Sequence, residues 1–153
     1  MTSTNNINLI NEHALEIPTL TPFQRMAEQL QKDDLSEPTF SLVILTSDEI
    51  QAINAQYRHK NKPTNVLSFP FEVPPDIPET IFDLGDILIC PDIIKREAIE
   101  QEKSYEDHFY HICIHGLLHL LKYDHMNEED ALIMESLEIE LLQTIQIKNP
   151  YTH

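Results

Sequence analysis

The chain has 153 residues, of which 41% are hydrophobic, and its formal net charge is −16. This length and composition predict one globular domain, residues 1–153, that is long enough to bury a core. The strong negative charge argues against general, non-specific nucleic-acid binding, although it leaves room for a local basic patch.

We expect neither a secretory signal nor a membrane-spanning segment. The first twenty residues lack the basic start and apolar centre of a secretory signal, and no apolar run is long enough to span a bilayer. Cys90 and Cys113 are far apart in apolar segments, which is typical of buried free thiols in a reducing compartment. We therefore expect a cytoplasmic protein that does not associate with membranes.

The first third of the chain alternates between strand-like and helical patterns. Residues 6–11 alternate polar and apolar side chains, which predicts a short half-buried strand. A Thr-Pro pair at residues 21–22 opens a helix, because proline is favoured in the first helical turn. The apolar run within residues 39–46 predicts a strand covered on both faces. A capping box at residues 46–49 then starts a helix over residues 49–57.

The next stretch differs in charge from the rest of the chain. Residues 50–71 contain no Asp or Glu, although the chain holds 26 of them, and residues 65–69 predict a short strand. We call its charged residues the basic island: Arg58, His59, Lys60 and Lys62. An anion-binding surface and a merely solvated loop fit this pattern about equally well.

A proline-rich connection separates the basic island from the second half of the chain. Residues 70–84 predict an extended wall or lid. Residues 84–90 predict a strand with a bulge or a close backbone approach at Gly85. Helices are expected over residues 91–101 and from residue 104 onward.

A last helix is expected after Asn127, which can cap it, and the tail from Pro150 onward is expected to fray. The helix carries an apolar stripe: Ala131, Met134, Leu137, Leu141 and Ile145.

The second half contains a histidine-rich helix. Residues 109–121 are apolar on nearly every side, which predicts a central, buried helix. His115 and His119 are four residues apart and therefore lie on one face. A turn after Lys122 can bring His125 back beside them. Three imidazoles with a fourth position left open to water are typical of a catalytic zinc site.

Gly116 lies inside this helix, where glycine costs about 1 kcal/mol relative to alanine. It predicts a close approach by another backbone or by the metal site. A peptidase of the His-Glu-x-x-His type carries its general base at this position, so the glycine argues against peptidase chemistry.

A rival ligand pair is His111 with His115. His111 and His119 are about 12 Å apart along the helix, so both cannot bind one zinc ion. The downstream pair is preferred because His125 can complete it. His108 and His111 are then expected to be core residues, to line a groove or to support a ligand.

Together these elements predict an α+β fold. A small mixed sheet of about four strands packs with about five helices around the histidine helix. Zinc with an open position favours hydrolysis. If the substrate is a phosphodiester, the guanidinium of Arg58 suits its non-bridging oxygens.

Three segments resemble the signature of the bacterial YbeY endoribonuclease family. They are YRHKNKPTNVLSFP at residues 57–70, LGDI at 84–87, and HGLLHLLKYDH at 115–125, and the likeness extends over roughly residues 48–142. In this resemblance the family's zinc ligands match His115, His119 and His125, and its catalytic arginine matches Arg58. The family usually has glycine where this chain has Lys122.

The resemblance implies that residues 1–153 form a single metal-dependent endoribonuclease domain that cleaves single-stranded RNA with one Zn²⁺ ion. It further implies a role in rRNA processing, including maturation of the small-subunit rRNA 3′ end, and in ribosome quality control. The ribosome or ribosomal proteins are the implied partners.

Two alternatives stay open: a zinc metallopeptidase-like hydrolase, and a ribosome-associated factor with a structural zinc. The latter needs a fourth protein ligand such as Asp124 or Glu128. Nickel or iron can bind the same imidazoles.

Overall fold

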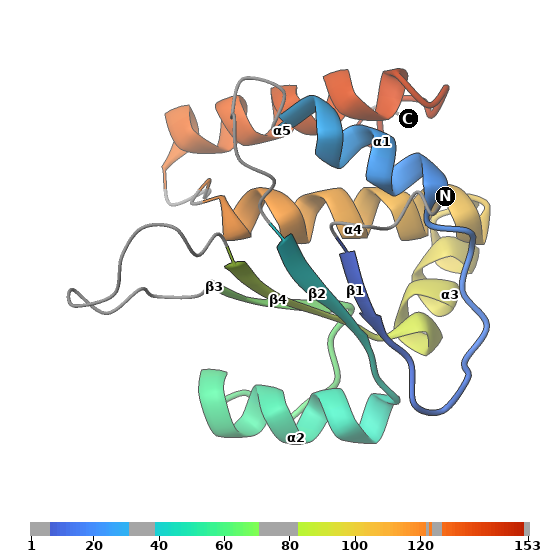
Figure 1. Ribbon diagram of the computed structural model, residues 1–153, viewed down its shortest axis with the longest axis vertical. Helices are drawn as coiled ribbons and strands as arrows, with labels where there is room; N and C mark the ends of the chain where they lie inside the picture. The colour runs from blue at the N-terminus through green and yellow to red at the C-terminus, as the bar shows by residue number, and fades with distance from the viewer. Residues whose placement is uncertain (1–6, 31–38, 71–82, 122, 124–126, 152–153) are drawn as a thin grey trace.

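The computed structural model describes residues 7–30, 39–70, 83–121, 123 and 127–151. The strands are β1 (Ile7–Ile10), β2 (Thr39–Ile44), β3 (Val66–Pro70) and β4 (Asp83–Ile89). The helices are α1 (Thr21–Leu30), α2 (Ser47–Arg58), α3 (Pro91–Glu100), α4 (Tyr105–Leu120) and α5 (Glu128–Gln143). Within these ranges the predicted α+β class is confirmed, with a four-stranded mixed sheet and five helices (Figure 1). None of the described helices is both long and apolar enough to cross a bilayer.

The sheet has the strand order β1-β2-β4-β3. Strands β1, β2 and β4 run parallel, and β3 pairs antiparallel with β4 along the edge. The predicted bulge at Gly85 is confirmed: its φ is 126°, and the register between β2 and β4 shifts at this point. Only glycine adopts such a backbone conformation without strain.

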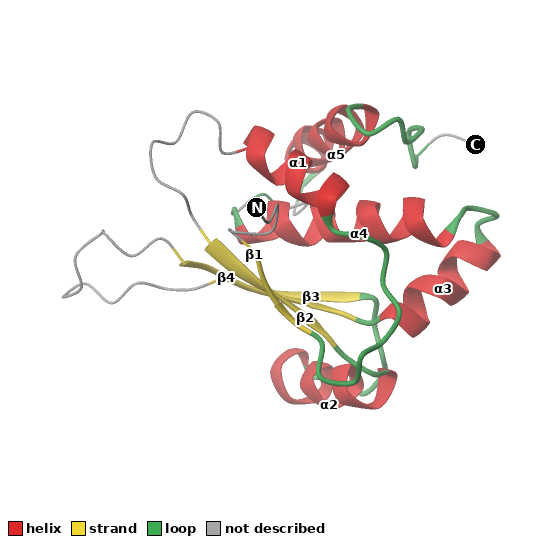
Figure 2. Ribbon diagram, turned by 45° about the vertical axis from the view of Figure 1, so that its right-hand side comes forward, coloured by secondary structure: helices red, strands yellow, loops and turns green. Residues whose placement is uncertain are grey.

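Helices cover both faces of the sheet (Figures 1 and 2). Helix α2 covers one face, where the core residues are Ile50, Leu67, Leu88 and Cys90. Helix α4 lies across the other face, and α1 and α5 lie beyond it (Figure 2). Ten of the 16 residues of α4 are buried, which confirms its predicted central place.

The predicted helix starts agree with the structure. Thr46 and Glu49 form the reciprocal capping box of α2, and Ser104 and Asn127 accept hydrogen bonds from the first turns of α4 and α5. Helix α4 ends at Leu120, and the backbone N–H of Tyr123 donates to the Leu118 carbonyl, which closes its last turn. The predicted turn carrying His125, and most of the proline-rich connection, lie outside the described residues.

The predicted close approach at Gly116 is confirmed, but the nearest atoms belong to side chains of the sheet and not to another backbone. A Cβ atom at this position would lie 2.8 Å from Ile87 Cγ2 and 3.1 Å from Val66 Cγ2. The missing side chain therefore lets α4 approach β3 and β4. The hydroxyl of Ser68 donates to the Gly116 carbonyl over 2.9 Å and fixes this contact.

Replacing Gly116 with alanine is expected to lower the free energy of unfolding by about 1 kcal/mol. Overpacking against two β-branched side chains costs about 1–3 kcal/mol, whereas the higher helix propensity of alanine returns about 1 kcal/mol. Thermal unfolding followed by circular dichroism tests this, with an expected fall in midpoint of about 2–4 °C. A raised midpoint would mean that the helix and sheet separate at little cost.

Candidate functional site

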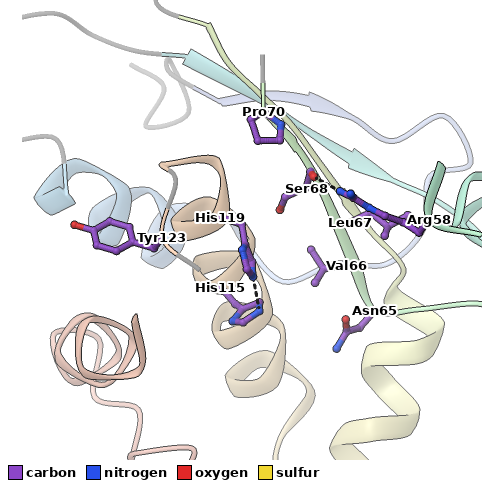
Figure 3. A pocket seen from close by; sticks show the side chains of 9 residues that line it. All are labelled: Arg58, Asn65, Val66, Leu67, Ser68, Pro70, His115, His119 and Tyr123. Atoms are coloured by element: carbon purple, nitrogen blue, oxygen red, sulfur yellow. Dashed lines mark hydrogen bonds between the residues drawn. The ribbon is translucent and has the colours of Figure 1, made fainter. Parts of the chain in front are cut away.

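A pocket of about 530 Å³ opens between α4, β3 and the end of α2. It contains three of the four residues predicted from the sequence, namely Arg58, His115 and His119, and Figure 3 shows their arrangement. His125 lies outside the described residues. The pocket is lined by Arg58, Asn65, Val66, Leu67, Ser68, Pro70, His115, His119 and Tyr123.

His115 and His119 face each other at the pocket wall formed by α4 (Figure 3). Their Nε2 atoms are 3.1 Å apart and their ring centroids 4.7 Å apart. Two nitrogen ligands on one tetrahedral zinc ion, with Zn–N bonds of about 2.0–2.1 Å, are separated by about 3.3 Å. The pair therefore has a spacing that suits two ligands of one ion.

Glu138 of α5 lies behind His115. One carboxylate oxygen accepts a hydrogen bond from His115 Nδ1 over 2.5 Å, and the glutamate side chain is 0% exposed. With Nδ1 carrying the proton, Nε2 of His115 keeps its lone pair on the pocket side. A carboxylate in this position is a recurring support of metal-binding histidines.

Other groups stabilise the Glu138 carboxylate. The hydroxyl of Tyr151 donates to its second oxygen, and His111 Nε2 lies 3.8 Å from the same oxygen. Burial raises the pKa of Glu138, but the nearby His111 and the hydrogen bonds from His115 and Tyr151 outweigh it and lower the pKa to about 2. Glu138 is therefore ionised at neutral pH. The expectation of a frayed tail was wrong at Tyr151, because the hydrogen bond to Glu138 ties it to the core.

Arg58 reaches the pocket from the last turn of α2. Its Nη2 atom donates to the carbonyl of Ser68 over 3.0 Å, and its guanidinium carbon lies 5.1 Å from the ring centroid of Phe69. The hydrogen bond uses one of five N–H donors, so others can bind an anion in the pocket. The basic island thus contributes directly to the same pocket as the histidine pair.

The rest of the basic island is held against α2. Asn54 is 3% exposed, and its side-chain amide donates to the Lys62 carbonyl over 2.9 Å. Its backbone carbonyl accepts a hydrogen bond from the Lys60 backbone N–H. His59 ends the helix in a left-handed conformation with φ of 59°. The island is therefore an ordered loop whose basic side chains are exposed, and Arg58 is its member that lines the pocket.

The donor set fits zinc as far as the described residues extend. Imidazole nitrogens are common zinc ligands, and both rings present Nε2 to the pocket. Within residues 7–30, 39–70, 83–121, 123 and 127–151, no third His, Cys, Asp or Glu completes a metal-binding group. Glu128, one alternative fourth ligand, is exposed at the start of α5, and Asp124 lies outside these ranges.

Comparison with known proteins places the chain in a family. The family model described as Endoribonuclease YbeY matches residues 4–146. The chain belongs to this family. The predicted membership is therefore confirmed, and with it the predicted enzyme class, a hydrolytic endoribonuclease.

Similar proteins include two curated YbeY endoribonucleases from Francisella. The protein of Francisella philomiragia subsp. philomiragia is 47% identical, over 95% of this chain and 94% of its own length. That of Francisella tularensis subsp. novicida is 48% identical, over 95% of this chain and 92% of its own length. The solution structure of TM1509 from Thermotoga maritima shares the fold, with a TM-score of 0.60, 24% identity and 96% coverage of both chains.

Sequence reasoning missed Glu138 and Asn65. Glu138 lies between Met134 and Leu141 on the buried face of α5, and a charged residue at such a position was the available signal. Asn65 directly precedes β3 and lines the pocket, but nothing in its local pattern distinguishes it from an ordinary turn residue.

Proposed function

We propose that this member of the YbeY family is a zinc-dependent endoribonuclease specific for single-stranded RNA. We further propose that it acts in rRNA processing, including maturation of the small-subunit rRNA 3′ end, and in ribosome quality control in the cytoplasm. The observation that carries the chemical part is one pocket that holds a histidine pair and an arginine. The rRNA and ribosome roles rest on family membership alone.

The proposed metal ligands are His115, His119 and His125. When bound, zinc supplies Lewis acidity that lowers the pKa of a coordinated water. Glu138 keeps the His115 ring in the tautomer that offers Nε2 to the pocket. Ser68 and Phe69 hold the guanidinium of Arg58 in place before RNA binds.

Arg58 is the proposed catalytic residue. A guanidinium can donate two parallel hydrogen bonds to the non-bridging oxygens of a phosphodiester. Negative charge builds on these oxygens as the phosphorus is attacked, so Arg58 stabilises the transition state more than the ground state. On a molecule with a net charge of −16, the basic island also supplies local attraction for the RNA backbone.

Incubation with three substrates, namely single-stranded RNA, duplex RNA and casein, tests the proposal against its alternatives. The purified protein is expected to cut a single-stranded RNA oligonucleotide, to leave the matching duplex and casein intact, and to lose activity with a chelator. Added Zn²⁺ should restore cleavage. Cleavage of casein would favour the peptidase alternative. Full RNA cleavage after complete zinc removal would show that zinc is not needed for the reaction and would favour a structural zinc.

Replacing Glu138 with glutamine is expected to weaken zinc binding by about 10- to 100-fold, because carboxylates behind ligand imidazoles contribute to that extent. The amide cannot supply the negative charge that favours the Nδ1–H tautomer of His115. Competition with a chromophoric chelator measures the affinity. Glu140→Gln is the matched control on the exposed side of α5, and equal affinities for the two variants would contradict this role.

A further inference from the structure

The pocket has a second polar wall that Arg58 and the histidine pair do not account for. Asn65 lies at the start of β3, across the pocket from α4 (Figure 3). Its backbone carbonyl accepts from the Cys90 N–H over 3.0 Å, which fixes the residue at the end of β4. The position of the side chain is thus set by the sheet.

A carboxylate fixes the orientation of the Asn65 amide. Asn65 Nδ2 donates to Glu97 Oε1 of α3 over 3.0 Å, and Oε2 of the same carboxylate is 3.4 Å away. An ionised carboxylate can accept hydrogen bonds but cannot donate them. The nitrogen of the Asn65 amide must therefore face Glu97, and the amide oxygen must face the other way. The amide cannot turn over without placing its oxygen against the carboxylate.

Glu97 is itself held in place. His108 of α4, which is 3% exposed, donates from Nε2 to Glu97 Oε1 over 2.9 Å. Hydrogen bonds from His108 and Asn65 lower the pKa of the Glu97 carboxyl against the opposing effect of burial. The ionised carboxylate is therefore maintained between two donors. This chain of contacts runs from the core of α4 through α3 to the pocket.

The outcome is a carbonyl oxygen presented to the pocket. Figure 3 shows the Asn65 oxygen on the side of Val66 and the histidine pair. Among the described residues, none donates a hydrogen bond to it. An amide oxygen repels phosphate and accepts from neutral O–H or N–H groups. Because Arg58 provides the cation for the phosphate, this oxygen is suited to another part of the nucleotide.

We infer that Asn65 is a recognition residue whose amide oxygen, fixed by Glu97 and His108, accepts a hydrogen bond from an O–H or N–H group of the bound nucleotide. The inference rests on the proposed RNA-cleaving function and deepens it. Two sources of the donor share this chemistry: the ribose 2′-hydroxyl, which distinguishes RNA from DNA, and the N–H groups of a base.

The test combines a change in the protein with a change in the substrate. Two series of single-stranded RNA oligonucleotides are made, and each oligonucleotide is altered at one nucleotide. In one series the altered nucleotide lacks its 2′-hydroxyl. In the other the base lacks its exocyclic amine or carries a methyl group on its ring N–H. The kcat/KM of each is measured with the wild-type protein and with Asn65→Ala.

At one position, removing the donor is expected to lower wild-type kcat/KM by about three- to tenfold, the value of one neutral hydrogen bond. Asn65→Ala is expected to cleave the unmodified RNA more slowly by a similar factor and to show no further loss at that position. This non-additivity is the coupling between Asn65 and the donor group. If it appears in the deoxy series, the donor is the ribose 2′-hydroxyl, and if it appears in the other series, the donor is an N–H group of the base.

Controls separate recognition from folding. Asn8→Ala removes an exposed amide on β1 and should reproduce the wild-type pattern. Asn65→Ser keeps a donor for Glu97 but places no carbonyl in the pocket, so it should behave like Asn65→Ala. Glu97→Gln offers Asn65 a donor as well as an acceptor, so the amide is no longer held in one orientation and the coupling should weaken.

The possible failures are distinguishable. If the wild-type protein does not cut single-stranded RNA, the proposed function fails. Suppose instead that the wild-type protein cuts the RNA, and that folded Asn65→Ala and Asn65→Ser lose the same factor in kcat/KM as the wild type with every altered RNA. That result overturns the recognition role of Asn65 and leaves the proposed function intact.

Discussion

Replacing Arg58 with alanine is expected to lower kcat/KM for single-stranded RNA by about 10²- to 10³-fold, the loss typical when one donor to developing negative charge is removed. Its guanidinium is already positioned at the pocket by the Ser68 carbonyl, so its removal leaves the phosphate without this partner. Initial rates on a fluorescently labelled RNA measure the effect. Bound zinc in the same preparation should be unchanged.

Two further variants make this experiment specific. Arg58→Lys keeps the charge but loses the two-pronged geometry, so an intermediate rate is expected. Arg25→Ala removes an exposed arginine on α1 that does not line the pocket, and its rate should match the wild type. If Arg58→Ala cleaves RNA at nearly the wild-type rate, or fails only because it has lost zinc, Arg58 has no part in the chemistry.

Replacing His119 with alanine is expected to remove most of the bound zinc and with it RNA cleavage. A direct ligand contributes more than a supporting carboxylate, so the fall in affinity should exceed about 100-fold. Elemental analysis of the purified variant beside the wild type gives the metal content. The measurement also identifies the ion, because nickel or iron would be detected in the same sample.

The control for this variant is His13→Ala. His13 is half exposed and lies 3.1 Å from Glu49, at the start of α2. It should keep full metal content and activity. Circular dichroism must show that His119→Ala is folded, since a ring partner of His115 is lost. A folded His119→Ala with full zinc content would exclude this residue as a ligand.

The parts of the fold that depend on near neighbours could be predicted from the sequence. The capping box at Thr46, the caps at Ser104 and Asn127, and the glycine bulge in β4 each depend on a few adjacent residues. The pairing of His115 with His119 follows from one helical turn. These features need no information about distant parts of the chain.

Features that depend on distant contacts could not be predicted. The contact of Glu138 with His115 joins residues 23 positions apart, and that of Asn65 with Glu97 spans 32. Strand order placed β4 between β2 and β3, so Gly116 packs against side chains of two strands that precede it by tens of residues. Such contacts are set by tertiary packing, which leaves no local signal.

The hydrogen bond from Tyr151 to Glu138 has a practical consequence for handling the protein. Residues close to the carboxyl end of the sequence help to support the histidine that faces the pocket. A truncation that removes Tyr151, or its replacement with phenylalanine, would take this support away. Preparations for metal analysis should therefore keep Tyr151.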